Sequence, residues 1–254
     1  MFNWNQLLSE ERRKTQYSLY KEDFRNGFEQ DYDTVVTFSS MRRLQDKTQV
    51  FPLQKNDFIH TRLTHSIQVS GVARSLGHHI STNILNSKLD SSFTYDHADK
   101  IPSLLATAGL VHDLGNCPFG HYGEYIIQNW FKEWFYSEEY LNFEKDGRGV
   151  THAQKQDFLK YDGNPQTIRI LSKLQFLNDH YGGNLTYATL SVLIKYPYSS
   201  DFSSKKFGYF QTEKDLFLDL LHAVGLKEGQ RHPLTPRNEE STSYRFPSSS
   251  IIAV

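Results

Sequence analysis

Apolar residues recur three and four positions apart along most of this chain, a spacing typical of helices that bury one face. The pattern predicts helices over 62–80, 101–113, 120–136, 167–177, 186–195 and 212–225. Only two short runs, at 35–38 and 49–53, resemble strands. The sequence therefore predicts an all-α fold, a helical bundle with at most a short β-hairpin.

Individual residues indicate where these helices begin, where they end and what they bury. Pro102 is expected in the first turn of its helix, where a missing N–H costs no hydrogen bond. Thr212 is a suitable N-cap and Gly225 a suitable terminator for the last helix. In the helix over 62–80 the candidate apolar positions are Leu63, Ile67, Val72 and Leu76. In the helix over 120–136 a broad apolar face would comprise Ile126, Ile127, Trp130, Phe131 and Trp134.

The remaining segments are read as connections. Residues 82–100 and 137–163 are polar, and residues 196–211 form a loop rich in Tyr, Ser and Lys. We expect residues 1–235 to form one domain. Residues 236–254 are rich in serine and lack helical periodicity until the last four positions, which predicts a disordered tail.

Composition limits the classes of function. The chain has 28 basic and 29 acidic residues, a formal net charge of −1. Single-stranded nucleic acid stays open as a partner, but this charge gives no global attraction for it. The N-terminus has no signal-peptide pattern, and no apolar run approaches the roughly 20 residues that span a bilayer. With Cys117 as its single cysteine, the chain is expected to be cytoplasmic, with no membrane partner.

Aromatic residues make up 14% of the chain, with 18 Phe and 15 Tyr. The cluster over 130–136 exceeds what one helix face buries in a small core. Because surplus apolar surface often marks interfaces, we expect a homo-oligomer.

The segment from His112 to Glu124 carries the candidate chemistry. Adjacent residues on a helix point about 100° apart. His112 and Asp113 can therefore face one point only where the helix ends. Gly115 and Pro118 favour such an end. An imidazole nitrogen and a carboxylate oxygen could then converge on one cation.

His121 and Glu124 lie one helical neighbour spacing apart, so they can form a hydrogen-bonded acid/base pair. Either pair alone is more often a solvated surface pair. Their occurrence together between apolar segments favours a site. His65, at the start of the helix over 62–80, is either a buried core histidine or a third metal ligand.

The motifs around these residues resemble the deoxyguanosine triphosphate triphosphohydrolase (dGTPase) branch of the HD-domain metal phosphohydrolases. The resemblance extends over residues 10–235, in which the matching segments occur in the family's order: 42–50, 61–66, 112–124, 162–164, 184–190, 195–197, 205–208 and 231–235.

The resemblance implies a divalent cation, such as Mg²⁺, Mn²⁺ or a similar transition metal, held by His65, His112 and Asp113. It implies that His121, oriented by Glu124, positions or deprotonates the attacking water or acts directly on the α-phosphorus of dGTP or another dNTP. The products would be the deoxynucleoside and inorganic triphosphate. Further substrate contacts would come from Gln45, Gln49, Val50, Arg62, Asn164, Lys195, Tyr196 and Lys206: Asn164, Lys195 and Lys206 on phosphate, Tyr196 beside them, Gln49 on the sugar, and Arg62 at the metal site or on phosphate.

Two features depart from the family pattern. Asn116 stands where many relatives have a further His. After Thr235 the family's Glu-Ala-Ala-Asp-Asp helix, whose first Asp is the fourth protein ligand, has no counterpart, as in a C-terminal truncation. Two alternatives therefore stay open: a catalytically impaired, nucleotide-binding or oligomerising fragment, and an HD hydrolase of another phosphate ester.

Overall fold

The computed structural model describes residues 3–14, 23–52, 56, 58–175, 180–202 and 206–226, and these residues form an all-α fold. The elements are α1 Trp4–Leu7, α2 Gly27–Val36, α3 Ser39–Arg43, η1 Leu44–Asp46, α4 Arg62–Ser87, α5 Tyr95–Val111, α6 Gly120–Trp134, α7 Glu138–Phe143, η2 Glu144–Arg148, α8 His152–Leu159, α9 Gly163–Arg169, η3 Ile170–Leu174, α10 Tyr187–Val192, η4 Gln211–Glu213 and α11 Lys214–Ala223. Within this described part, β-structure is limited to isolated bridges, such as Thr48 to Thr61. The prediction of an all-α fold is confirmed.

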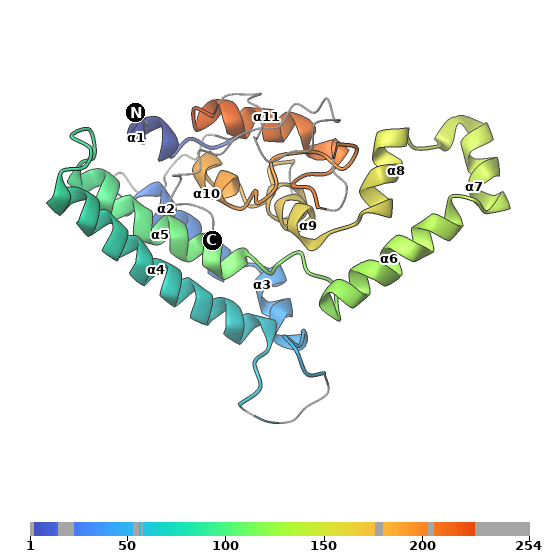
Figure 1. Ribbon diagram of the computed structural model, residues 1–254, viewed down its shortest axis with the longest axis horizontal. Coiled ribbons are helices and arrows are strands. Elements are labelled where there is room, and N and C mark those ends of the chain that lie inside the picture. The colour runs from blue at the N-terminus through green and yellow to red at the C-terminus, as the bar shows by residue number, and fades with distance from the viewer. Residues whose placement is uncertain are drawn as a thin grey trace.

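Helices α4 and α5 lie side by side as a long antiparallel pair along one edge of the molecule (Figure 1). Their contact is unusually close. A Cβ on Gly77 would lie 2.9 Å from the Cα of Pro102, and a Cβ on Gly109 would lie 3.0 Å from the Cα of Ser70. The Ser70 hydroxyl donates to the Ala106 carbonyl at 2.8 Å. This pairing brings the start of α4 next to the end of α5.

The main core lies between α5 and the helices that cover its C-terminal half. Leu110, Val111 and Leu114 pack with buried side chains from α2, α3, α9, η3, α10 and α11. A second cluster, which includes Trp4, Phe28 and Leu104, fixes the first helix against the other end of the α4–α5 pair.

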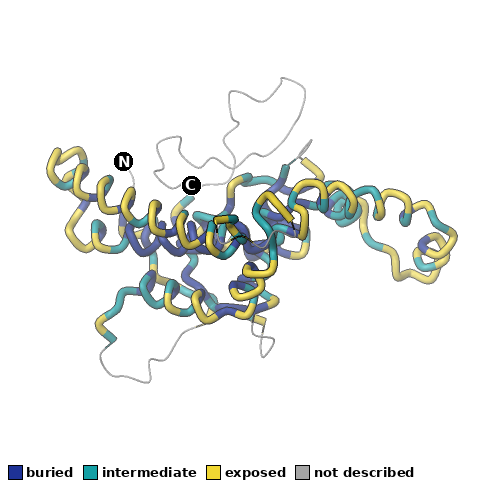
Figure 2. The backbone as a smooth tube through the Cα atoms, turned by 90° about the horizontal axis from the view of Figure 1, so that it is seen from below, coloured by how far each residue is buried: buried dark blue, intermediate teal, exposed yellow. Residues whose placement is uncertain are grey.

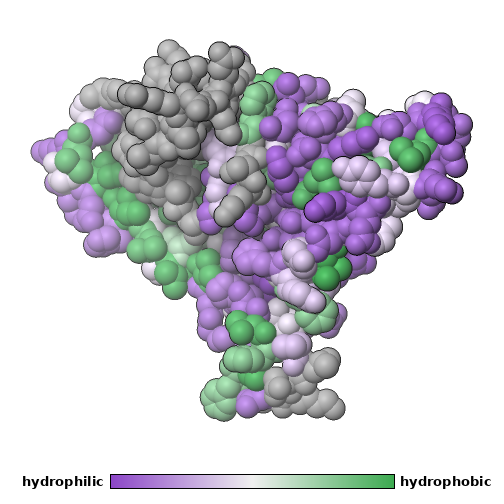
Figure 3. All heavy atoms as spheres, turned by 45° about the vertical axis from the view of Figure 1, so that its right-hand side comes forward, coloured by the Kyte–Doolittle hydropathy of each residue, from purple (hydrophilic) through white to green (hydrophobic). Residues whose placement is uncertain are grey.

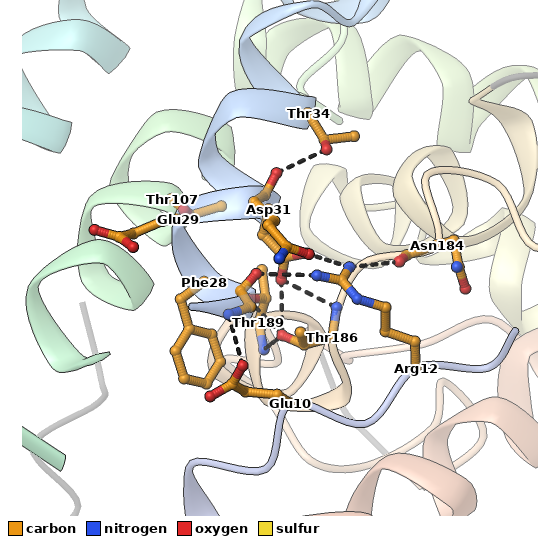
Figure 4. A network of polar contacts seen from close by, with 12 residues as sticks. Glu10, Arg12, Phe28, Glu29, Asp31, Thr34, Thr107, Asn184, Thr186 and Thr189 are labelled. Atoms are coloured by element: carbon orange, nitrogen blue, oxygen red, sulfur yellow. Dashed lines mark hydrogen bonds and ion pairs between the residues drawn. The ribbon is translucent and has the colours of Figure 1, made fainter. Parts of the chain in front are cut away.

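A buried polar network joins the N-terminal segment to α2 and α10 (Figure 4). Asp31 is fully buried and accepts a 2.5 Å hydrogen bond from Arg12. Its other carboxylate oxygen accepts from the backbone N–H and the hydroxyl of Thr186, at 3.0 and 2.7 Å. Thr186 is the N-cap of α10, so this network fixes where α10 begins.

Helices α6, α7 and α8 form an arm that extends away from the core (Figures 1 and 2). Aromatic side chains hold the arm together: the Phe131 and Phe158 ring centroids are 4.5 Å apart, and those of Trp134 and Tyr140 are 4.8 Å apart. On α6 the predicted broad apolar face is only partly used, because Ile126 and Trp130 remain exposed. Glu124 is the buried residue of this helix.

Several predictions about local structure were wrong. Residues 35–38 belong to α2 and the turn into α3; Val35 lies in the last turn of α2 and Phe38 is the N-cap of α3, and both are buried in the core. Beyond the isolated bridge at Thr48, residues 49–52 form no strand, and Leu53 lies outside the described residues. Residues 82–100 contain the end of α4 and the start of α5, and 137–163 contain α7, η2 and α8.

Helix starts and buried faces also differ from expectation. Helix α5 begins at Tyr95, where Thr94 and His97 form a capping box, so Pro102 lies inside the helix. Thr212 lies in the turn η4 and does not cap α11, although Gly225 does end the helical region with a positive φ of 72°. In α4 the predicted positions Ile67, Val72 and Leu76 are exposed, and the buried side is formed by Arg62, Ser66, Ser70, Ala73, Gly77, Ser81 and Ile84.

Hydrophobic side chains also gather on the segment that projects beside the start of α4, at the bottom of the molecule in Figure 3. Val50, Phe51 and Phe58 are exposed there.

In the predicted helix over 167–177, residues 167–174 belong to α9 and η3, while residues 176 and 177 lie outside the described residues. The predicted helix over 186–195 is shortened to α10. The tail over 236–254 lies outside the described residues. Among the described helices, none has the length and apolar character needed to span a bilayer.

Candidate functional site

Three potential metal ligands converge where α4 begins and α5 ends. His65, His112 and Asp113 each offer one ligand atom, and these atoms lie within 4.8 Å of one another. The two imidazole rings are 5.3 Å apart and nearly perpendicular. Two nitrogens and one carboxylate oxygen at this spacing fit a divalent cation.

The hydrogen bond at His112 and the burial of His65 both favour an imidazole that can bind a cation. Nδ1 of His112 lies 2.8 Å from the Gly109 carbonyl, which can only accept, so Nδ1 carries the proton. This leaves the lone pair of Nε2 on the side of Asp113, 3.4 Å from its carboxylate. Burial, and then the charge of His112, lower the pKa of His65. A lowered pKa keeps His65 neutral and able to act as a ligand.

Arg62 and Asn116 hold Asp113 from two sides. Arg62 donates to Oδ2 at 2.7 Å, and the side chain of Asn116 donates to Oδ1 at 2.6 Å. Arg62 and Asp113 are both buried. The ammonium of Lys47 donates to the Asn116 carbonyl at 2.8 Å. Burial, followed by the charge of Arg62, lowers the pKa of Lys47.

His121 and Glu124 form the expected pair in the first turns of α6. Nδ1 of His121 lies 2.9 Å from Oε2 of Glu124. The Glu124 side chain is buried, whereas that of His121 is 88% exposed. Phe119 and Gly120, which precede the histidine, both have positive φ. Such backbone is strained for Phe119, and strain of this kind is often found at functional sites.

The start of α9 supplies a second carboxylate next to this pair. Asp162 is almost fully buried; its Oδ1 accepts from the backbone N–H of Asn164 at 2.8 Å and from the Asn164 side chain at 2.6 Å. Its Oδ2 accepts from Lys206. Oε1 of Glu124 accepts from the Gly163 N–H at 2.9 Å. Predicted residues from three distant segments therefore meet around two buried carboxylates.

The segment that follows the ligands His112 and Asp113 packs directly on the start of α9, with no space for side chains between the two backbones. A Cβ on Gly115 would lie 2.2 Å from the Gly163 carbonyl, and a Cβ on Gly163 would lie 2.2 Å from the Asn116 side chain. The Gly115 N–H donates to the hydroxyl of Thr167 at 2.9 Å. The spacing between the candidate metal ligands and α9 is thus set by direct backbone contact.

The remaining predicted contacts lie around this centre with fewer fixed partners. Gln45 is exposed and accepts a weak 3.5 Å bond from Thr61. Gln49 is half-buried, and its side-chain oxygen is buried with no hydrogen-bond partner among the described residues. Val50 is exposed. Lys195 is exposed, and its ammonium lies 5.7 Å from the ring centroid of Tyr196.

Reasoning from the sequence missed the parts played here by Lys47, Asn116 and Asp162. Lys47 and Asp162 both stand inside the motifs that matched, but nothing in their spacing shows which atoms they contact. Asn116 was noted only as a departure. Cys117, the single cysteine, is buried, with its thiol 3.3 Å from the Gly120 carbonyl.

Residues 62–172 match the model of the HD domain family. This range begins at Arg62, includes all three candidate ligands and the His121–Glu124 pair, and ends just after α9.

Curated relatives are similar over most of the chain. A "deoxyguanosinetriphosphate triphosphohydrolase-like protein" of Listeria innocua is 47% identical over 91% of this chain and 51% of its own length. One of the same name from Synechocystis is 39% identical over 91% of this chain and 55% of its own length. A "deoxyguanosinetriphosphate triphosphohydrolase" of Yersinia enterocolitica is 34% identical over 82% and 46%. The chain spans about half the length of these relatives.

Proposed function

Since the chain belongs to the HD-domain family, we propose that it is a metal-dependent phosphohydrolase acting on dGTP or another deoxynucleoside triphosphate. The observation that carries the proposal is the convergence of His65, His112 and Asp113 within 4.8 Å. The names of the relatives support the substrate class.

His65, His112 and Asp113 would hold the divalent cation. A bound divalent cation supplies Lewis-acid polarisation of a phosphoryl oxygen and a lower pKa for water. Arg62 and Asn116 keep the Asp113 carboxylate in one orientation, because each of its oxygens already accepts one hydrogen bond. The remaining lone pairs of the two Asp113 oxygens stay available to a metal ion.

The His121–Glu124 pair would handle the proton. Glu124 accepts from Nδ1, which leaves the lone pair of Nε2 on the exposed side of the ring. Nε2 can then take a proton from water as the water oxygen bonds to the α-phosphorus. The bond between that phosphorus and the sugar oxygen O5′ breaks, O5′ takes a proton from solvent, and Nε2 returns its proton to solvent. The products are the deoxynucleoside and inorganic triphosphate.

The triphosphate would be bound by cations and amides around this pair. Lys206 and Asn164 are already held next to Glu124. Arg62 is buried, and its Nε has no hydrogen-bond partner within the described part of the chain. Lys195 and Tyr196 would contribute from the neighbouring loop. Gln45, Gln49 and Val50 would contact the sugar and base, and the unpaired oxygen of Gln49 suits a sugar hydroxyl.

We also propose a cytoplasmic homo-oligomer. The exposed side chains of Ile67, Val72 and Leu76 on α4, with Trp130 on α6, provide apolar surface of the kind that subunit interfaces cover.

The proposal is tested by incubating the purified chain with each dNTP and Mg²⁺ or Mn²⁺, then separating the products by chromatography. Nucleoside and tripolyphosphate are expected in equal amounts. Release of monophosphate with pyrophosphate would disprove the reaction assignment. Absence of any product, with the metal bound, would favour a fragment that binds nucleotides without hydrolysing them. A variant at an exposed lysine of α6, Lys132→Ala, serves as the control beside His112→Ala.

A further inference from the structure

The ammonium of Lys206 lies between two buried carboxylates that have different tasks. Asp162 accepts its hydrogen bond directly, while Oε2 of Glu124 is 3.6 Å away. That same Oε2 accepts from Nδ1 of His121. Lys206 is therefore ion-paired with both carboxylates, more loosely with Glu124, and a closer approach to Glu124 would compete with the histidine.

Asp162 also holds a second predicted phosphate contact. Its other oxygen accepts from the backbone and the side chain of Asn164, at 2.8 and 2.6 Å. Only 2% of the Asp162 side chain is exposed, so it is poorly placed to touch a ligand itself. The carboxylate acts on its two neighbours and fixes them relative to Glu124.

Building on the proposed triphosphate substrate, we propose that Asp162 is a positioning residue for phosphate binding. It keeps Lys206 and Asn164 together on one side of α9, with the ammonium hydrogen-bonded to Asp162 and at the longer ion-pair distance of 3.6 Å from Glu124. The benefit is preorganisation: a long lysine side chain that is already held in place loses less rotamer freedom when phosphate binds.

The effect of Asp162 on Lys206 is local, because the start of α9 is held in place by other contacts. Gly163 follows Asp162 and packs directly on Asn116, and its N–H is bound by Glu124. Before Asp162, the Tyr161 carbonyl accepts a 2.8 Å hydrogen bond from the Gln128 side chain. Because the backbone on both sides of Asp162 is held by these contacts, loss of its charge changes chiefly the position of Lys206.

Asp162→Asn is the informative variant. Asparagine is as good an N-cap as aspartate, so it keeps the start of α9 and one acceptor for Asn164, but loses the charge that holds Lys206. Inorganic tripolyphosphate in the presence of Mn²⁺, measured by calorimetry, is the probe, since it needs no turnover. We expect Asp162→Asn to weaken its binding about tenfold, the scale of coupling inside one hydrogen-bonded network.

A double-mutant cycle tests the route of this effect. In a Lys206→Ala background, Asp162→Asn should change tripolyphosphate affinity by less than about twofold, because the lysine it positions is gone. Equal losses in both backgrounds would overturn the inference, as would unchanged or tighter binding in the single variant. Thermal unfolding of each variant checks that the fold is retained.

A second measurement uses the unmodified protein, in case a variant does not fold. Lys206 should react with an amine-acylating reagent at a higher pH midpoint than the exposed Lys132, since two carboxylates stabilise its ammonium. Tripolyphosphate should protect it. A midpoint no higher than that of Lys132, or lack of protection, would contradict the inference. If dNTPs are not hydrolysed while tripolyphosphate binding shows the expected coupling, the proposed function fails and the role of Asp162 stands.

Discussion

The guanidinium of Arg62, at the first residue of α4, donates a 2.7 Å hydrogen bond to the Asp113 carboxylate just beyond the end of α5, and both groups are buried. The two residues are 51 positions apart in the sequence. The pair joins the two helix ends that carry the candidate ligands and presents the carboxylate in one orientation.

Removing Arg62 should therefore destabilise the fold, because the Asp113 carboxylate would stay buried without its ion-pair partner. Arg62→Met retains an apolar side chain of similar length, and we expect it to lower the free energy of unfolding by about 3–5 kcal/mol. Mn²⁺ should recover part of this loss, since a cation supplies the missing positive charge. Urea unfolding with and without metal measures both effects. The double variant Arg62→Met/Asp113→Asn should be more stable than Arg62→Met; the opposite order would contradict the argument.

The two histidines of the site should respond differently to truncation. His112→Ala removes a ligand and should abolish stoichiometric metal in elemental analysis. His121→Ala should keep the metal but slow dNTP hydrolysis by about 100-fold or more, the usual scale for an acid/base residue. Equal metal loss in both variants would show that His121 belongs to the metal site instead.

Lys195 differs from Lys206, because its side chain is exposed and its ammonium lies 5.7 Å from the ring centroid of Tyr196. If it binds phosphate, Lys195→Ala should weaken tripolyphosphate binding by about 1.5–3 kcal/mol, the cost of a charge-assisted hydrogen bond. Calorimetry at two salt concentrations measures this. Unchanged affinity, matching that of Lys132→Ala, would make Lys195 a solvated surface residue.

Asp157 should make stability depend on pH. Burial raises its pKa to about 6, although hydrogen bonds from Ser200 and the Gln211 N–H oppose the shift. Because the pKa of Asp157 is raised in the folded state, its protonated carboxyl stabilises the fold. This stabilisation is complete below the unfolded pKa of 3.8 and is lost as pH rises through the folded pKa of about 6. Relative to wild type, Asp157→Asn should gain up to about 3 kcal/mol between pH 4 and pH 7. Urea unfolding at both pH values measures the difference, and a constant difference would contradict this sign.

Local periodicity was enough to locate α5, α6 and α11, which contain long apolar or amphipathic segments. Helix α4 was located too, but the apolar positions that predicted it, Ile67, Val72 and Leu76, are exposed. Local periodicity failed where tertiary contact decides the outcome. Pro102 looked like a helix start, but the capping box of Thr94 and His97 begins α5 seven residues earlier. Val35 and Phe38 looked like a strand because a short apolar run has no clear period.

The contacts of the candidate site were likewise predictable only in part. The ligand types and the His121–Glu124 spacing could be predicted, since three-residue spacing on a helix already brings two side chains together. The partner of Lys206 could not be predicted, because Asp162 lies 44 residues away and only the fold brings them into contact. Asn116 is only three positions from Asp113, and its side chain reaches the carboxylate in the turn that directly follows α5.

The serine and glycine residues between α4 and α5 have a consequence for how this protein tolerates sequence change. Most cores accept any apolar residue of suitable volume and reject polar ones. At Gly77 and Gly109 this rule should fail, because even a Cβ would lie 2.9 or 3.0 Å from the backbone of the other helix. In saturation mutagenesis, glycine should be retained at these two positions, and Ser70, whose hydroxyl bonds the Ala106 carbonyl, should not accept leucine or valine. Any widening of the contact between α4 and α5 would move His65 away from His112. A larger side chain in the middle of the helix pair should therefore cause loss of bound metal at its end.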